Sequence, residues 1–312
     1  MAAVLSITFP IYCAIAIGYA AVRTGMFRRE DMRVLGQYVM TVALPALLFH
    51  AVASRDFSEV LQPGYLGVYL AGGLATIATT FAWFTLTAPD KRRRALAVMG
   101  CSCPNSGFVG YPLLLLVLPD LAGVALALNF LVENVVLIPI CLILMDLAED
   151  RQGRSVGQTI GRIFLDLIRR PMIIGLAAGL AVSLAGIAMP EPVSRLLGML
   201  AASASALALV VIGGSLAGLP LHGNRAMAAQ IAVGKLVWHP LMTALAVVAL
   251  AAFGIVLSPE LRMAAILSAA IPIFGVYTVF AQERGLEGAA SIAMLAATGG
   301  AFITLSALLV LL

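Results

Sequence analysis

Long apolar stretches separated by short polar gaps organise the whole sequence. Each stretch runs for about 20 residues and is apolar on every helical face, which is the length that an α-helix needs to cross the hydrocarbon core of a bilayer. Strands of a membrane barrel would instead alternate apolar and polar residues over about ten positions. The pattern predicts an all-α integral membrane protein with ten transmembrane helices. The expected spans are residues 3–22, 34–52, 65–87, 95–117, 121–145, 171–189, 195–218, 226–254, 262–281 and 289–311.

Composition supports a lipid-embedded chain. Of the 312 residues 62% are hydrophobic and 11% are charged, whereas soluble domains average about 45–50% apolar and about 25% charged residues. The net charge of +4 comes from short basic clusters between the apolar stretches, so we expect no nucleic-acid partner. The three histidines are scattered and the four cysteines lie in or beside apolar stretches, so we expect no metal and no cofactor. Motifs of membrane hydrolases are missing from the sequence, and we expect no enzyme.

The distribution of arginine and lysine predicts how the spans are oriented. Basic residues gather in alternate gaps, and such gaps face the cytoplasm in most membrane proteins. This predicts a multi-pass protein of the cell (inner) membrane with both termini extracytoplasmic. The clusters in the first, third and fifth gaps comprise Arg23, Arg28, Arg29 and Arg33, then Lys91, Arg92, Arg93 and Arg94, then Arg151, Arg154, Arg162, Arg169 and Arg170.

The two halves of the chain repeat the same pattern of spans. An offset of 168 residues places each span of residues 1–145 on a span of residues 171–312, and Pro104 on Pro272. Five spans per half is an odd number, so the halves must run in opposite directions. Inverted repeats of this kind are typical of secondary transporters. Residues 146–170 form the expected cytoplasmic linker, whose second part predicts an amphipathic helix lying at the membrane interface.

Helix-breaking residues occur at matching places in the two halves. Proline removes a backbone donor and clashes with the preceding turn, and glycine relaxes the backbone. Two broken helices, the fourth and the ninth, are therefore expected to cross near the bilayer centre, where the free N–H groups of a half-helix attract anions. The predicted substrate-binding residues are Pro104, Asn105, Ser106, Gly107, Pro272, Ile273, Gly275 and Tyr277.

Ionisable side chains within spans form a second group of candidates. Glu133 and Lys235 lie at similar depth in the fifth and eighth spans, where a charge is costly and is a functional suspect. The pair is either a static ion pair or a coupling site, in which Glu133 binds a proton or a sodium ion. Asn129 and Asn134 accompany Glu133, and His239 follows Lys235 by one turn.

Several segments resemble the auxin efflux carrier family, which includes the plant PIN-FORMED transporters. They are LPALLFHA (44–51), PNSGFVGYP (104–112), LALVVIGGSLAG (207–218), KLVWHP (235–240) and IPIFGVYTVFAQERG (271–285). The resemblance implies two inverted five-helix repeats, with a scaffold domain of helices 1, 2, 6 and 7 and a transport domain of helices 3–5 and 8–10. It also implies a homodimer formed through the scaffold.

The same resemblance carries two statements about the site. Asn105 matches the asparagine that contacts the substrate carboxylate in plant members, and Glu133 stands where those members carry glutamine. Together with the repeat, this predicts a secondary transporter of small organic anions, either auxin-like monocarboxylates or dicarboxylates, that works by an elevator-like alternating-access mechanism. Two alternatives stay open, a cation/proton antiporter on a similar fold and a membrane sensor that binds its ligand without moving it.

Overall fold

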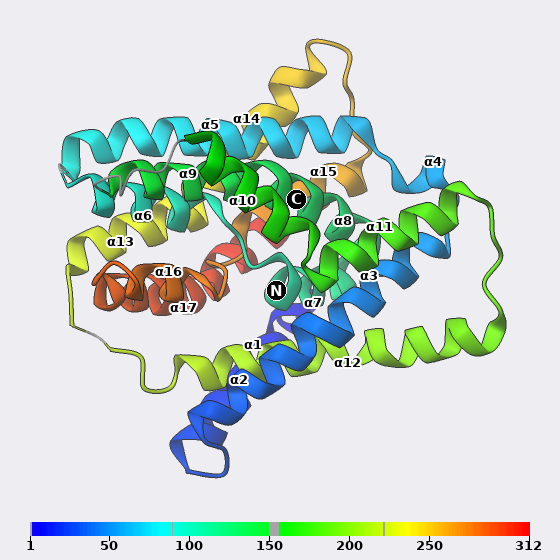
Figure 1. The fold of residues 1–312 in the computed structure, drawn as a ribbon, viewed down its shortest axis with the longest axis horizontal. Coiled ribbons are helices and arrows are strands. Elements are labelled where there is room, and N and C mark those ends of the chain that lie inside the picture. The colour runs from blue at the N-terminus through cyan, green and yellow to red at the C-terminus, as the bar shows by residue number, and fades with distance from the viewer. Residues whose placement is uncertain (1, 89, 150–155, 221) are drawn as a thin grey trace. The chain divides into compact units, whose positions relative to one another are not determined.

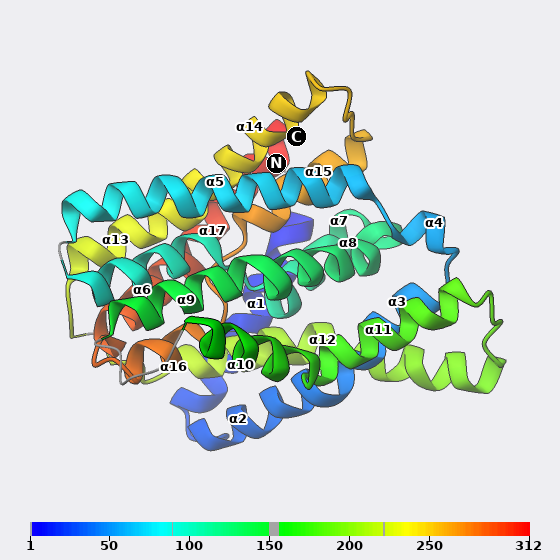
Figure 2. The same ribbon diagram turned by 45° about the horizontal axis from the view of Figure 1, so that its top comes forward.

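The computed structural model describes residues 2–88, 90–149, 156–220 and 222–312, and every regular element in these ranges is a helix. Figures 1 and 2 show the helices from two directions. Within the described ranges seven helices are long and apolar enough to cross a membrane, which confirms the all-helical membrane class. They are Val4–Arg23, Arg29–Ala53, Phe57–Thr87, Pro119–Ala148, Glu191–Leu216, Arg225–Ala251 and Glu287–Leu311.

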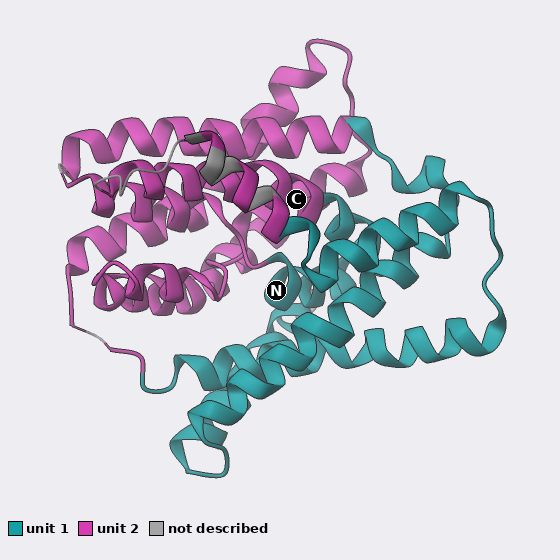
Figure 3. Ribbon diagram, in the orientation of Figure 1, with its two compact units in different colours: residues 1–63, 106–128, 167–218 teal, residues 64–105, 129–166, 219–312 magenta. Residues whose placement is uncertain are grey.

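The chain folds into two compact units (Figure 3). Unit 1 comprises residues 1–63, 106–128 and 167–218, and unit 2 comprises residues 64–105, 129–166 and 219–312. The elements of unit 1 are α1 (Ala2–Arg23), α2 (Arg29–Tyr38), the π-helical segment η1 (Val39–Ala43), α3 (Leu44–Ala53), α4 (Phe57–Val60), η2 (Ser106–Gly110), α7 (Tyr111–Val117), most of α8 (Pro119–Val132), α11 (Pro171–Leu184) and α12 (Glu191–Leu216).

Unit 2 contains the helices that carry most of the candidate residues. Its elements are α5 (Pro63–Thr87), α6 (Lys91–Ser102), the last turn of α8, η3 (Glu133–Leu137), α9 (Ile138–Ala148), most of α10 (Val156–Ile168), α13 (Arg225–Val233), η4 (Gly234–Trp238), α14 (His239–Ala251), α15 (Pro259–Ala270), α16 (Tyr277–Gln282) and α17 (Glu287–Leu311).

Glycine allows the helices of unit 1 to pack closely. Gly175 and Gly179 lie one turn apart on α11, and both face the backbone of α3. A methyl group added at Gly175 would lie 2.6 Å from the carbonyl oxygen of Pro45, and one added at Gly179 would lie 2.9 Å from that of Phe49. Small residues at this spacing let membrane helices approach closely and gain van der Waals contact. Such packing matters in lipid, because the hydrophobic effect does not drive helices together there. The α1 and α12 helices meet through glycines in the same way.

Prolines explain where the four π-helical segments found among the described residues lie. Each segment ends two residues before a proline, namely Pro45, Pro112, Pro139 and Pro240. Because proline has no N–H group and its ring clashes with the preceding turn, the helix before it widens and its hydrogen bonds shift by one residue. The α-helix then resumes with the proline in its first turn. These π-helical turns place Glu133 and Lys235, the two charged candidates, on locally widened helix.

Three of the ten expected spans differ from a single long helix. The span expected at residues 95–117 consists of α6, η2 and α7, and the span expected at 262–281 consists of α15 and α16, so both are interrupted where the prolines predicted a break. The span expected at 171–189 ends earlier, at Leu184. Gly186 has a φ of 61° there, and the N–H of Ile187 bonds back to Val182, which closes the helix with a left-handed cap.

In the described part of the linker, residues 156–168 form the helix α10. Arg151 and Arg154, two of the predicted cytoplasmic arginines, lie outside the described residues. Leu167 near the end of α10 is buried and Ile168 is exposed.

Candidate functional site

The two proline breaks lie directly against each other in unit 2. Pro104 pairs with Ile273 in an isolated antiparallel bridge. The amide of Asn105 donates to the carbonyl of Pro272 at 2.9 Å, and the amide of Phe274 donates to the carbonyl of Cys103 at 3.3 Å. Two extended segments far apart in sequence thus join two interrupted helices at one place, which is called the crossing below and comprises residues 103–105 and 271–274.

Local sequence explains the extended backbone of the crossing. A residue that precedes proline is pushed out of the helical region by the proline ring. Cys103 before Pro104 has φ −105° and ψ 103°, and Ile271 before Pro272 has φ −69° and ψ 155°. The α6 and α15 helices therefore both end just before the crossing, and their last turns are buried on every side over residues 95–102 and 264–270.

The helix ends give the crossing its electrostatic character. The α6 and α15 helices direct their last carbonyl groups toward it, while η2 and α16 begin just after it in the chain. Helix N-termini carry unpaired N–H groups and partial positive charge, and helix C-termini carry the opposite. Asn105 is 8% exposed and immediately precedes the first residue of η2. The crossing thus contains a buried side-chain amide, which is a group that can donate a hydrogen bond to a carboxylate.

The structure places the eight predicted substrate residues in three different settings. Pro104, Asn105, Pro272 and Ile273 form the crossing itself. Tyr277 is fully buried against α6, and its hydroxyl oxygen would lie 2.8 Å from a methyl group added at Gly100.

The remaining three residues border the crossing. Gly275 is exposed and lies between the crossing and α16, whereas Ser106 and Gly107 begin η2, which belongs to unit 1.

Glu133 is buried and hydrogen-bonded. Its side chain is 3% exposed, and its Oε1 atom accepts a hydrogen bond of 2.7 Å from the hydroxyl of Tyr69 on α5. Asn134, the next residue, donates from Nδ2 to the carbonyl of Phe130 on its own helix. Glu133 and Asn134 therefore face different partners, although they are neighbours in the chain.

Asn129 joins three helices. Its Oδ1 atom accepts a hydrogen bond of 2.8 Å from the hydroxyl of Tyr65, and its Nδ2 group donates to the Ser268 hydroxyl at 2.8 Å. Ser268 lies in the last turn of α15, three residues before the crossing. Asn129 thus connects α5 and the fifth expected span to the end of the helix that leads into the crossing.

Lys235 is fully buried in η4 and bonds to the end of α15. Its Nζ atom donates to the carbonyl of Ala269 and lies 3.0 Å from Nδ1 of His239. An ammonium group can only donate, so His239 accepts through Nδ1 and, when neutral, carries its proton on Nε2. The charges of Glu133 and Lys235 also act on each other within the unit. The two candidate groups are thus parts of one buried polar region around the last turn of α15.

Three members of this region were missed from the sequence, namely Tyr65, Tyr69 and Ser268. Hydroxyl groups are common in membrane helices and carry no charge, so they do not stand out as costly residues. The signal was the spacing of the two tyrosines, four residues apart in an apolar span and thus on one helical face.

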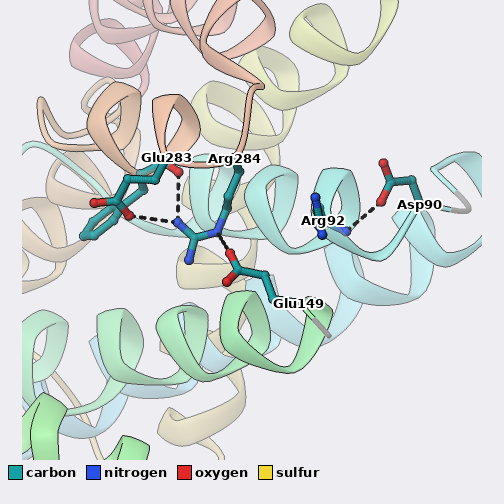
Figure 4. Close-up of polar contacts among 6 residues, drawn as sticks. Asp90, Arg92, Glu149, Glu283 and Arg284 are labelled. Atoms are coloured by element: carbon teal, nitrogen blue, oxygen red, sulfur yellow. Dashed lines mark hydrogen bonds and ion pairs between the residues drawn. The ribbon is translucent and has the colours of Figure 1, made fainter. Parts of the chain in front are cut away.

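A charged cluster lies apart from the crossing, where the turn between α16 and α17 meets the end of α9 (Figure 4). The side chain of Arg284 is 10% exposed, and its Nε atom lies 2.8 Å from a carboxylate oxygen of Glu149. Its Nη1 atom donates to Glu283 at 3.1 Å and to the carbonyl of Phe280 at 3.0 Å. Arg284 thereby fastens the start of the linker to the last hairpin of unit 2.

The helical membrane fold and the paired helix breaks define a multi-pass membrane protein of transporter type. The sequence model of the family described as "Membrane transport protein" matches residues 3–309, and the chain belongs to this family, that of the auxin efflux carriers. The match covers nearly the whole chain, which confirms the family resemblance seen in the sequence.

Two relatives illustrate the range of the family. The chain is 28% identical over 294 residues to a Rhizobium meliloti (strain 1021) protein named "Putative malonate transporter", covering 92% of this chain and 88% of that protein. It is 26% identical over 136 residues to "Auxin efflux carrier component 2" of Arabidopsis thaliana, covering 43% of this chain and 20% of that protein.

Proposed function

We propose that this protein is a secondary transporter of small organic anions, and that the anion binds at the crossing. The observation that carries the proposal is the antiparallel pairing of residues 103–105 with residues 271–274. Backbone that leaves helical geometry inside a membrane is tolerated where it is buried in protein or lines a cavity, and in transporters such breaks form the substrate site. In this proposal Asn105 donates its amide to a carboxylate of the substrate.

The proposal includes the remaining features of the fold. Ten spans form two inverted repeats, and both termini lie outside the cytoplasm. The third to fifth and the eighth to tenth spans act as the transport domain, which moves like an elevator against a scaffold of the first, second, sixth and seventh spans (α1, α2, α3, α11 and α12). Two copies of the chain associate through the scaffold. The family, the matching proline breaks and the alternate basic gaps support these statements.

Glu133 is proposed as the coupling group, which takes up a proton during the transport cycle. A carboxylate that is 3% exposed in a span is costly unless it is hydrogen-bonded or protonated. Lys235 supplies a positive charge in the same buried region and also fixes the carbonyl end of α15. Uptake of a negatively charged substrate together with a proton would leave less net charge to move across the membrane.

Ligand binding to the purified protein tests the substrate class. Malonate is the first anion to try, because one relative bears the name of a malonate transporter, followed by succinate, acetate and an indole carboxylate. We expect at least one carboxylate to raise the unfolding temperature at two pH values, because a ligand that binds the folded state stabilises it by mass action. If no carboxylate changes the unfolding temperature and a cation raises it, the result would favour the cation/proton antiporter instead.

The Asn105→Ala variant tests whether the anion binds at the crossing or elsewhere in the protein. Loss of a hydrogen bond to a charged group typically costs about 1.5–3 kcal/mol, which corresponds to a loss of affinity of roughly 10- to 100-fold. Asn224→Ala is the matched control, because Asn224 caps the start of α13 through the amide of Met227. The control should lose about 1 kcal/mol of stability and keep its affinity. Equal affinity in Asn105→Ala and the control would contradict binding at the crossing.

A further inference from the structure

Two buried tyrosines on α5 face two buried polar side chains in matching positions. The Tyr65 hydroxyl donates to Asn129 Oδ1 at 2.8 Å, and the Tyr69 hydroxyl donates to Glu133 Oε1 at 2.7 Å. The two residues of each pair are 64 positions apart in the sequence. The step of one turn from Tyr65 to Tyr69 on α5 is therefore matched by the step of one turn from Asn129 to Glu133 in the fifth expected span. Both tyrosines are fully buried and their rings are stacked with centroids 6.0 Å apart. The two pairs differ mainly in their acceptor, which is an amide in one and a carboxylate in the other.

The difference in acceptor gives the two hydroxyl groups different physical effects. A hydrogen bond to an ionised carboxylate is stronger than one to a neutral amide, and it stabilises the ionised form relative to the protonated form. The Tyr69 hydroxyl therefore acts on the proton affinity of Glu133. The Tyr65 hydroxyl holds a group that does not titrate, and it contributes to packing and to the position of Asn129.

Other titratable groups around Glu133 lie on α5 itself and in two further places in unit 2. Tyr65 lies on α5, Cys103 at the end of α6 and Lys235 in η4, and the charge of the Glu133 carboxylate acts on each of them. Lys235 is the basic group in this set. It interacts with Glu133 electrostatically, and its Nζ atom donates a hydrogen bond to the carbonyl of Ala269. Tyr69 contacts the carboxylate oxygen directly, at hydrogen-bonding distance. Because its hydroxyl is neutral, this contact can be removed without removing a charge.

We propose that Tyr69 is a positioning residue for the coupling carboxylate: its hydroxyl holds Oε1 of Glu133 and sets the pH range over which Glu133 takes up and releases its proton. This inference rests on the proposed role of Glu133 in coupling. Tyr69 acts through Glu133 and needs no contact with the transported anion.

The test compares Tyr69→Phe with Tyr65→Phe, which is a matched control because it removes a similarly buried hydroxyl from the same helix. Purified proteins are reconstituted into vesicles, and uptake of labelled malonate, or of the carboxylate found in the binding panel, is measured as a function of pH. We expect Tyr69→Phe to move the pH midpoint of transport about one unit toward alkaline pH, because the carboxylate without its donor holds the proton more firmly. Tyr65→Phe should keep the wild-type midpoint.

Glu133→Gln distinguishes failure of this inference from failure of the proposed coupling. If Glu133→Gln flattens the pH profile while Tyr69→Phe keeps the wild-type midpoint, the role of Tyr69 is wrong and the coupling role of Glu133 stands. If Glu133→Gln itself keeps the wild-type profile, the coupling role is wrong. In the Glu133→Gln background, adding Tyr69→Phe should cause no further change of the profile.

A second variant covers the case in which Tyr69→Phe does not fold. Glu133→Asp keeps the charge and shortens the side chain by one methylene, which withdraws the carboxylate from the Tyr69 hydroxyl. It should also move the midpoint toward alkaline pH. A wild-type midpoint in a folded Glu133→Asp protein would overturn the inference.

Discussion

At the scale of single residues, Glu133 and Lys235 are the charged groups that the sequence marked and that the structure places in one buried region. Sequence reasoning found them because a charge in an apolar span is rare and costly. It left open whether they form a static pair or a coupling site. Glu133 accepts a hydrogen bond from Tyr69, and Lys235 bonds to Ala269 and His239.

Glu133→Gln separates the two possibilities. Glutamine resembles the protonated acid in shape and in hydrogen bonding, so for a coupling residue we expect transport that no longer depends on pH while exchange of substrate continues. For a static partner of Lys235, the same change leaves a buried unpaired charge, which typically costs about 3–5 kcal/mol. The protein would then fold poorly and recover with Lys235→Met. Thermal unfolding and pH-dependent exchange, measured on both variants, decide between these results, and a stable variant with a wild-type pH profile contradicts both.

At the scale of helices, the positions of the prolines made it possible to predict which helices are interrupted. The spans and the interruptions between α6 and η2 and between α15 and α16 follow from apolar length and from Pro104 and Pro272. The sequence could not show that the two interruptions pair with each other through backbone hydrogen bonds, because pairing depends on how distant helices pack. It also did not reveal the π-helical turns, although each of them precedes a proline by the same spacing.

The packing of α6 against α9 can be tested with the native cysteines. The two helices lie side by side in unit 2 (Figures 1 and 2), and the sulfur atoms of Cys103 and Cys141 are 3.9 Å apart. We expect diamide, which oxidises two thiols to a disulfide, to link Cys103 to Cys141 in purified protein. Cys101 is the internal control, because it is buried with its sulfur directed at the carbonyl of Ile231 on α13.

Peptide mapping by mass spectrometry reads out this result. A cross-link between Cys103 and Cys141 that disappears in Cys141→Ser supports the packing of α6 on α9. Cross-linking of Cys101 to Cys141 in place of Cys103 would contradict it.

At the scale of the whole molecule, the proposed orientation in the membrane rests on the sequence alone. It depends on basic residues in alternate gaps, and Arg151 and Arg154 of the linker lie outside the described residues. In the proposed arrangement of two inverted five-span repeats the halves run in opposite directions, so a change in the side of one terminus reverses the whole arrangement.

Labelling of the chain ends tests this orientation. Cysteines introduced as Ala2→Cys or Leu311→Cys, in a Cys13→Ser background, should react with a membrane-impermeant thiol reagent in intact cells, because both ends are proposed to face outward. A cysteine introduced at Arg93, in a proposed cytoplasmic gap, should react only after lysis. Labelling of both chain ends only after lysis would reject the proposed topology.

Vesicle uptake tests the central claim most directly, namely that the protein moves an organic anion bound at the crossing. Purified wild-type protein, Asn105→Ala and Asn224→Ala are reconstituted at equal density, and entry of labelled malonate, or of the carboxylate identified by binding, is followed against an unlabelled internal pool. The account predicts saturable uptake by the wild type and by Asn224→Ala, and uptake reduced at least tenfold in Asn105→Ala at a subsaturating concentration. Binding of the carboxylate without entry into the vesicles would identify a sensor and contradict the account, as would equal uptake by Asn105→Ala and the wild type.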